Sequence, residues 1–206
     1  MSELTQKLAA ASGLREALVV RIMHSAPTRY KDFRVKKRNG DYRVVSQPAR
    51  EVKALQRAIL EIVIDNLPVH PAATAYRTGQ SILQNALPHA GHGPILKMDF
   101  RDYFPSIRRR DWIAYCNETG CLFGDDIELS ASLLFRKTPG RRDLRLAIGA
   151  PSSPAVSNAL MFRFDSALTE RLEMDHVTYT RYADDLTFSA RAPFEHFESR
   201  VDSQIG

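Results

Sequence analysis

The sequence predicts an α+β fold, with helices and short antiparallel strands interspersed along the chain. Two observations lead to this prediction. Apolar residues recur at helical spacing near the N-terminus and again after Glu51. Two segments, residues 33–48 and 178–190, each contain two runs of strand-forming residues around a short polar turn. Residues 154–172 are expected to form one long helix that crosses between strands.

The first elements follow from residue spacing and from helix breakers. Residues 3–24 carry an apolar stripe that ends before Pro27, which predicts one or two helices. Residues 33–48 alternate around the Asn-Gly pair of "RNGD", a strong signal for a hairpin, and this hairpin is basic. From Glu51 to Pro68 the apolar residues fall at helical spacing and predict an amphipathic helix packed beneath the hairpin.

The second half of the chain again alternates helices and strands. A loop and a short helix lead into "GPILKMDF", a strand that ends near Asp99. Ser106 is the expected N-cap of a helix that continues to about Asn117. A basic, polar segment then extends to Arg145. A loop rich in Gly, Pro and Ser precedes the helix over residues 154–172, and the hairpin "TYTRYADDLTFSA" follows it.

Composition limits the class of protein. The 206 residues are 44% hydrophobic and 26% charged, as in globular proteins with a buried core. No run approaches the roughly 18 to 20 apolar residues that a membrane span needs. The N-terminus lacks a basic start followed by an apolar block, so it does not resemble a secretory signal. Cys116 and Cys121 are the two cysteines, which suits a reducing compartment, and we expect a cytosolic protein.

The charge balance favours a polyanionic partner. Lys and Arg outnumber Asp and Glu by 29 to 24, and the positive charge is concentrated in residues 29–43, 108–111 and 136–145. Basic clusters bind nucleic acid in many proteins, but they also occur as solvated faces. Charge alone therefore leaves both interpretations open.

Three carboxylates fall at the ends of predicted strands. Asp99 ends one strand, and Asp184 and Asp185 form the turn of a hairpin. If these strands are neighbours, the carboxylates meet at one edge of the sheet, where like charges cost free energy unless a cation lies against them. Oxygen ligands on an open surface favour Mg²⁺, and two such ions can support phosphoryl transfer. On spacing alone, ordinary turn and capping residues remain an alternative.

Five segments resemble, in order and spacing, the motifs of reverse transcriptases. "YADD" at residues 182–185 resembles their YxDD signature. "LKMDFRDYFPSI" at 96–107 and "GAPSSPAVSN" at 149–158 are similar to palm motifs of the bacterial retron-type enzymes. "KRNGDYRVVSQPAREVKALQRAIL" and "AYRTGQSILQNALPH" are similar to the finger motifs of this group. The resemblance covers about residues 30–190.

This resemblance implies a right-hand polymerase core, with fingers followed by palm, an antiparallel palm sheet backed by helices, and no thumb. It implies an N-terminal helical segment over residues 1–28, fingers over 29–93 and an incomplete palm over 94–206, with room for a fingers-type insertion around 120–146. Family members continue after the YxDD motif into further palm motifs and a thumb. The resemblance is therefore to a truncated member, either a fragment or a naturally short relative that borrows a thumb.

The resemblance also implies catalytic residues. Asp99, Asp184 and Asp185 become the carboxylates that hold two Mg²⁺ ions, and the backbone carbonyl of Phe100 becomes a further ligand. Phe104 falls on the steric-gate position, where a rigid aromatic ring leaves no room for a ribose 2′-hydroxyl and deoxynucleotides are preferred. The alternative for Phe104 is a core aromatic.

Other matching positions concern the triphosphate and the nucleic acid. Arg43 and one of Lys36 or Lys37 match residues that grip the triphosphate, since Arg forks suit phosphate and Lys adds a point charge. The alternative is a solvated hairpin tip. Arg77 is expected to face the template strand, and Tyr182 to pack near the primer end.

In "GAPSSP", the resemblance implies a floor for the nucleotide and the template base. Gly149 permits close approach of a backbone, Ala150 and Pro151 follow it in the loop, and Pro154 adds stiffness. Ile148 departs from the family pattern, which has Gln there, and its side chain cannot hydrogen-bond the nucleotide.

Four further residues are expected to have ordinary structural roles. His89 and His92 are predicted to be loop histidines, because no further metal ligands cluster with them. Asp102 is predicted to be a structural carboxylate, and Trp112 a core residue.

The implied reaction is RNA-templated DNA synthesis. A primer 3′-hydroxyl, or an RNA 2′-hydroxyl, attacks the α-phosphate of a deoxynucleoside triphosphate and releases pyrophosphate. The implied partners are a structured non-coding RNA, dNTPs and an effector protein in anti-phage defence, with no membrane, in the bacterial cytoplasm. Two alternatives remain: a group II intron-like reverse transcriptase, and an RNA-binding fragment that does not polymerise.

Overall fold

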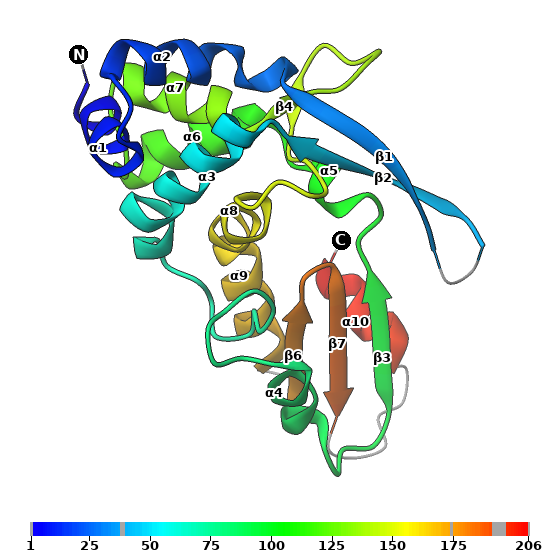
Figure 1. The fold of residues 1–206 in the computed structure, drawn as a ribbon. Helices are drawn as coiled ribbons and strands as arrows, with labels where there is room; N and C mark the ends of the chain where they lie inside the picture. The colour runs from blue at the N-terminus through cyan, green and yellow to red at the C-terminus, as the bar shows by residue number, and fades with distance from the viewer. Residues whose placement is uncertain (1, 38–39, 174, 191–196, 206) are drawn as a thin grey trace. The chain divides into compact units, whose positions relative to one another are not determined.

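The computed structural model describes residues 2–37, 40–173, 175–190 and 197–205, which form helices and antiparallel sheets (Figure 1). The predicted α+β class is confirmed. The chain divides into two compact units, and each combines two stretches of sequence. Unit 1 consists of residues 1–67 and 102–160, and unit 2 of residues 68–101 and 161–206. None of the described helices is long and apolar enough to cross a membrane.

Unit 1 is mainly helical and has one large apolar core. The N-terminal segment forms two helices, because Gly13 ends the first in the left-handed conformation, with φ of 68°. Trp112 is fully buried, as predicted, and its indole N–H donates to Ser130 Oγ at 2.9 Å. The helices of unit 1 are α1 (Glu3–Ser12), α2 (Glu16–Ser25), α3 (Arg50–Ile62), α5 (Tyr103–Ser106), α6 (Arg109–Thr119), α7 (Asp125–Leu134) and α8 (Ser153–Leu160).

Helix α7 lies where the sequence predicts only a basic, polar segment. Its first turn contains Asp125, Asp126 and Glu128, which resemble surface residues but favour a helix N-terminus. The remainder of α7 is largely buried, with Leu133 and Leu134 fully enclosed in the core. Packing against the other helices of unit 1 therefore determines that this segment is helical. Its acidic first turn makes the segment resemble exposed surface in the sequence.

The expected N-cap at Ser106 is wrong. Ser106 ends the short helix α5, and the following helix α6 begins three residues later, at Arg109. The carboxylate of Asp111 accepts a hydrogen bond from the N–H of Arg108 at 2.7 Å, which satisfies a backbone donor at the start of α6. The cap is thus supplied from inside the helix.

The basic hairpin of unit 1 consists of β1 (Tyr30–Lys36) and β2 (Tyr42–Pro48). The Asn-Gly turn predicted for it includes Asn39, which lies outside the described residues. A second, two-stranded sheet pairs β4 (Arg136–Lys137) with β5 (Leu144–Arg145). The two sheets are linked by an ion pair, in which the guanidinium of Arg136 donates to both carboxylate oxygens of Asp32 at 2.6 and 3.2 Å.

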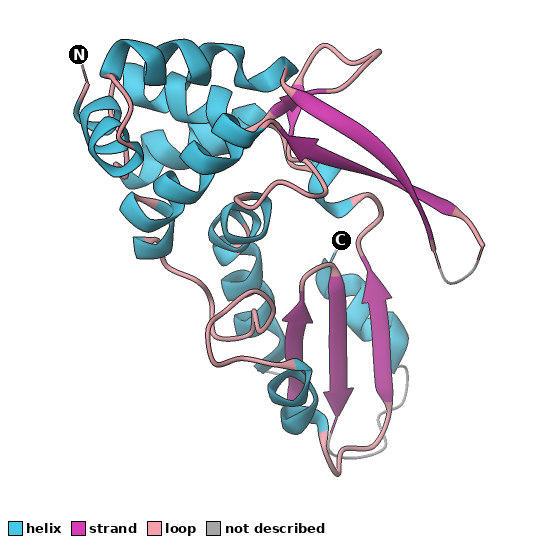
Figure 2. Cartoon of the chain, in the orientation of Figure 1, coloured by secondary structure: helices cyan, strands magenta, loops and turns pink. Residues whose placement is uncertain are grey.

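Unit 2 contains a three-stranded antiparallel sheet. The strand order is β3 (Ile95–Asp99), β7 (Asp185–Ala190), β6 (Val177–Tyr182), so the strand made first in the chain pairs with the strand made last. Helices α9 (Phe162–Glu173) and α10 (Phe197–Ile205) lie behind the strands in the view of Figure 2. Helix α4 (Ile82–Ala86) lies near β6 and continues into a 3-10 turn, η3 (Leu87–His89).

The two faces of this sheet differ in chemistry because side chains alternate along each strand. One face carries Leu186 and Phe188, and it packs on Leu168 and Leu172 of α9. The other face carries Asp185, Thr187 and Ser189 along the central strand. Asp185, and Asp99 opposite it on β3, therefore lie on the face away from the apolar core of unit 2.

The long helix expected over residues 154–172 is interrupted. Helix α8 ends at Leu160 and α9 begins at Phe162, with Met161 between them, and the two helices belong to different units. Apolar residues continue at helical spacing on both sides of Met161, so the sequence does not indicate that the helix is interrupted there.

Candidate active site

The carboxylate turn joins β6 to β7 through two residues, Ala183 and Asp184. Tyr182 and Asp185 are paired across its base, as expected for a two-residue hairpin loop. Ala183 is buried and has a φ of 61°, a left-handed conformation that non-glycine residues seldom adopt. The turn is therefore a strained, well-defined element.

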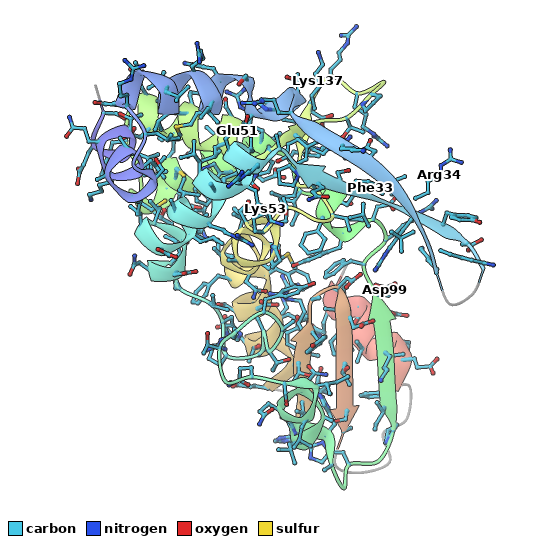
Figure 3. All side chains as sticks on the ribbon, in the orientation of Figure 1. Phe33, Arg34, Glu51, Lys53, Asp99 and Lys137 are labelled. Carbon is cyan, nitrogen blue, oxygen red and sulfur yellow. The ribbon has the colours of Figure 1, made fainter. Side chains whose placement is uncertain are left out.

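The third carboxylate, Asp99, lies directly opposite Asp185 in the pairing of β3 with β7. One residue further, the N–H of Phe100 donates to the backbone carbonyl of Asp184 at 3.1 Å. Residues directly opposite one another in an antiparallel pair have side chains on the same face. Asp99 and Asp185 thus share a face, and Figure 3 labels Asp99 at the end of β3.

A row of three cross-strand neighbours follows from the same register. Tyr182 on β6 is opposite Asp185 on β7, and Asp185 is opposite Asp99 on β3. Asp99 and Asp185 are exposed, whereas Tyr182 and Asp184 are half-buried. The structure therefore brings Tyr182 and the three predicted catalytic carboxylates to one corner of the sheet.

The donor set at this corner consists of oxygen atoms, which is the ligand type that Mg²⁺ prefers. Among the described residues, however, no three His, Cys, Asp or Glu side chains are arranged so that they could hold a metal ion together. The backbone register places Asp99 opposite Asp185, with Asp184 in the adjoining turn, and these three carboxylates are the oxygen set at this corner. Such a set fits an ion that keeps several waters and is completed by substrate phosphate oxygens.

The "GAPSSP" loop in unit 1 contacts the basic hairpin. The carbonyl of Ile148 accepts a hydrogen bond from the N–H of Ser46 at 2.6 Å. Gly149 has a φ of 107°, and a Cβ placed there would lie 2.7 Å from Val45 Cγ1 and 3.2 Å from the carbonyl oxygen of Ser46. The close approach that Gly149 permits here is that of strand β2. Ile148 takes part in this contact through its backbone carbonyl, so the contact does not depend on the side chain at position 148.

Strand register separates the basic residues of the hairpin. Arg43 is opposite Val35, and Lys36 is opposite Tyr42, so Arg43 and Lys36 lie on opposite faces. Lys37 follows β1, and its N–H donates to the carbonyl of Asp41 at 2.6 Å. By alternation, Lys37 belongs to the face of Arg43. Of the two lysines left open by the sequence, Lys37 is the one on the same side as Arg43.

Asp32 anchors the base of this hairpin electrostatically. Burial by itself would raise the pKa of its carboxyl, but hydrogen bonds from Ser46 and Arg136, together with the Arg136 charge, outweigh that effect. The net result is a pKa below the ordinary value of an aspartate. The exposed part of the hairpin, which includes Arg43, therefore extends from a base that the Asp32–Arg136 ion pair holds in place.

The remaining predicted residues have mixed surroundings. The ring of Phe104 is half-buried beside the core of unit 1, and its centroid lies 5.2 Å from that of Tyr103. Arg77 donates through Nη1 to the carbonyl of Ala73 at 3.1 Å, which holds the guanidinium against its own loop. Ala150 is buried and Pro151 is half-buried. The roles of these residues toward nucleotide and template stay predictions.

Sequence reasoning did not single out Val45 and Ser46, the partners of the "GAPSSP" loop, and no local signal relates residues about a hundred positions apart. It also passed over Arg181, which is fully buried directly before the YADD motif. Here a signal existed. Alternation along "TYTRY" assigns Arg181 to the face of Tyr179, the apolar face of the sheet, and a charge at such a position requires a partner.

Comparison with known proteins gives a consistent result. Residues 35–202 match the family described as reverse transcriptase (RNA-dependent DNA polymerase). The chain is 38% identical over 175 residues to the retron Mx162 reverse transcriptase of Myxococcus xanthus, a match that covers 79% of this chain and 36% of that protein. It is 37% identical over 172 residues to the retron Ec83 reverse transcriptase of Escherichia coli, with coverage of 82% and 55%.

Among solved structures, telomerase from Candida albicans, in complex with a fragment of telomeric RNA, superposes with a TM-score of 0.53. The match covers 90% of this chain and 40% of that chain, at 13% sequence identity, and supports the fold alone. The chain thus spans between about a third and a little over half of the length of these similar proteins.

Proposed function

The chain belongs to the reverse transcriptase (RNA-dependent DNA polymerase) family, and from this premise we propose that it supplies the fingers and palm of a retron-type enzyme that synthesises DNA on an RNA template. One observation carries the proposal. Asp99 is paired with Asp185 across β3 and β7, and the carbonyl of Asp184 accepts the N–H of Phe100 beside them. Acidic side chains from two strands are thereby gathered where a primer end would have to react.

The three carboxylates are proposed to hold two Mg²⁺ ions, with the carbonyl of Phe100 as a further ligand. When bound, such ions lower the pKa of an attacking hydroxyl and offset the charge that develops on the leaving phosphate. Asp99, Asp184 and Asp185 would hold the ions and so would position the reacting groups. The primer 3′-hydroxyl, or an RNA 2′-hydroxyl, would lose its proton to solvent and form a bond to the α-phosphorus, while the bond from that phosphorus to pyrophosphate breaks.

Residues of unit 1 are proposed to select the nucleotide. Arg43 and Lys37 share a face of the hairpin by register and would bind the triphosphate, whereas Lys36 would not. Phe104 would exclude the 2′-hydroxyl of a ribonucleotide by its bulk. Gly149, Ala150 and Pro151 would support the base, with the loop held to strand β2.

The proposed template is a structured non-coding RNA, because relatives at 37 to 38% identity are retron reverse transcriptases. Arg77 and Tyr182 are proposed contacts of template and primer. An anti-phage role with an effector protein, in the bacterial cytoplasm, is part of the same proposal and depends on the resemblance to retron enzymes. The group II intron-like alternative shares the motifs, but no specific observation favours it.

Magnesium-dependent primer extension on an RNA template tests the proposal. Asp184→Asn is expected to lower synthesis by about 1,000-fold, which corresponds to roughly 4 kcal/mol of transition-state stabilisation. RNA binding and folding should persist. Asp202→Asn, an exposed carboxylate on α10, is the matched control and should behave like the unmodified chain.

The measurement is made on this chain and on the longest natural product that contains it. Equal synthesis by the Asp184→Asn variant and the unmodified protein would remove the proposed catalytic role. RNA binding without synthesis in both forms of the unmodified protein would instead support the RNA-binding alternative.

A further inference from the structure

A fully buried ion pair lies in unit 2 beside the carboxylate turn. Arg181 on β6 and Asp165 on α9 each have no exposed side-chain surface. Arg181 Nε donates to Asp165 Oδ1 at 2.9 Å, and Nη2 donates to Oδ2 at 2.7 Å, which forms a bidentate fork. The hydroxyl of Tyr179 also donates to Asp165 Oδ1, at 2.8 Å. The carboxylate is thus held by two side chains of the same strand.

The guanidinium makes a further contact, and this one is with the turn itself. Arg181 Nη1 donates to the carbonyl of Ala183 at 3.0 Å. Ala183 is the residue with a φ of 61°, a conformation that is unfavourable for a non-glycine residue and persists only where the surroundings impose it. The same peptide unit carries the N–H of Asp184. Fixing the carbonyl of Ala183 therefore fixes the plane from which Asp184 departs.

Arg181 is itself held firmly through its backbone. Its N–H donates to the carbonyl of Ala72 at 2.8 Å, and its carbonyl accepts the N–H of Thr74 at 2.9 Å. On the other side, Arg181 is paired with Leu186 of the central strand. A group that orients another with useful precision must be locked in this way by its own neighbours.

Stability alone does not account for this arrangement. Desolvating two charges costs several kcal/mol per ion, and apolar side chains of similar volume are often at least as stabilising as a buried ion pair. A Lys at position 181 could keep the charge, but it lacks the planar fork that reaches Asp165 and the Ala183 carbonyl together. The geometry favours a role in orienting the turn.

We propose that Arg181 and Asp165 form a positioning pair that holds the carboxylate turn in its strained conformation and so sets the direction of the Asp184 carboxylate toward a bound metal ion. The proposal rests on the proposed function as far as the metal ion is concerned. Its structural part, that the pair fixes the turn, stands independently of catalysis.

The test compares Arg181→Lys and Asp165→Asn with the unmodified chain by two measurements. The first is amide hydrogen exchange at Ala183 to Leu186 and at Phe100, whose N–H is bonded to the Asp184 carbonyl. The second is affinity for Mn²⁺ by calorimetry, without substrates. We expect faster exchange at these amides and Mn²⁺ binding weaker by about 10-fold to 100-fold, the usual effect of removing a partner that orients a metal ligand.

Arg136→Lys is the matched control. Arg136 forms a similar fork with Asp32 in unit 1 and is nearly buried, with 8% of its side chain exposed. This variant should lower the melting temperature while exchange at residues 183–186 and Mn²⁺ affinity remain as in the unmodified chain. If Arg181→Lys or Asp165→Asn does not fold, Tyr179→Phe replaces it, since this change removes one bond to Asp165 and keeps the ring.

Each outcome decides a different point. Arg181→Lys that lowers the melting temperature but leaves exchange at the turn and Mn²⁺ affinity unchanged would overturn the positioning role. Failure of the proposed function would show itself separately, as Mn²⁺ affinity that Asp184→Asn does not reduce. In that case the exchange measurement still decides whether Arg181 holds the turn.

Discussion

The two units hold their candidate residues by different physical means. In unit 2, Asp99 and Asp185 are placed by strand register, and the turn that precedes Asp185 is bonded at Ala183 and at Asp184. In unit 1, the exposed Arg43 lies on a hairpin that meets the "GAPSSP" loop through the Ser46 to Ile148 hydrogen bond and the surface of Gly149. The first arrangement depends on backbone pairing and on hydrogen bonds to the turn, whereas the second depends on the absence of a Cβ at Gly149.

The largest effect within this comparison is expected at Gly149. Gly149→Ala places a Cβ 2.7 Å from Val45 Cγ1, in a backbone conformation with φ of 107° that suits glycine. The loop and β2 must separate, and a misplacement of about 1 Å can cost 100-fold in rate. We expect kcat/KM for dNTPs to fall by about 10-fold to 100-fold in steady-state primer extension.

A second substitution isolates the cause. Val45→Ala removes Cγ1, so the double variant Gly149→Ala, Val45→Ala should recover part of the loss, while the conformational cost at position 149 remains. If the single variant behaved like the unmodified chain, the contact between loop and hairpin would have no part in nucleotide selection.

An effect of similar size is expected at Phe104. Phe104→Ala should reduce discrimination against ribonucleotides by about 10-fold to 100-fold, the range in which a packed apolar site rejects an added hydroxyl. The ratio of kcat/KM for dNTP and for the matching NTP measures it. Tyr103→Phe, which keeps a ring at the neighbouring buried position, is the control. An unchanged ratio would return Phe104 to the role of a core aromatic.

The two faces of the hairpin provide a finer comparison. Arg43→Ala and Lys37→Ala should each raise KM for dNTPs by about 10-fold, since charge-assisted hydrogen bonds are worth about 1.5–3 kcal/mol and exposure reduces this. Lys36→Ala should leave KM unchanged, because register places Lys36 on the other face. A loss at Lys36 equal to that at Lys37 would contradict the assignment of faces.

The smallest expected effect concerns His89 in unit 2. Its two ring nitrogens lie 2.7 Å from Ser189 Oγ and 2.8 Å from Thr180 Oγ1, and burial, with the charges of His92 and Lys97, lowers its pKa below 6.5. The unfolded chain then binds a proton that the folded chain does not. The free energy of unfolding should therefore decrease as pH falls through about 6.5.

Urea unfolding at several pH values measures this dependence. His89→Gln should be less stable at neutral pH and should show a flatter pH profile. His24→Gln, at an exposed position on α2, should keep the profile of the unmodified chain. If His89→Gln kept the same profile, other groups would have to account for it.

Local patterns were sufficient where the chain forms hairpins and amphipathic helices. The strand-forming runs beside Asp184 predict β6 and β7, and the apolar spacing after Glu51 predicts α3. Local patterns were insufficient where tertiary packing determines the secondary structure. Helix α7 has an acidic start that resembles surface, and the break at Met161 lies inside a continuous apolar pattern. Propensity carries no information on such packing.

The same limit applies to the candidate site. The convergence of Asp99 with Asp184 and Asp185 could be expected if their strands are neighbours, and the pairing of β3 with β7 meets this condition. The choice between Lys36 and Lys37 could not be made, since it depends on hairpin register, which a one-residue shift would invert. The partner of Gly149 also could not be found, because sequence spacing does not report which distant strand approaches a loop.

The order of strands in unit 2 has a consequence for biosynthesis. Strand β3 leaves the ribosome well before β7, which is the strand it pairs with, and β6 also precedes β7. A nascent chain therefore presents an unpaired β3 edge until residues 100–190 have been made, and non-local pairing of this kind is slow and exposed to aggregation. The metal-binding corner proposed here can assemble only after translation has passed the last residue of β7.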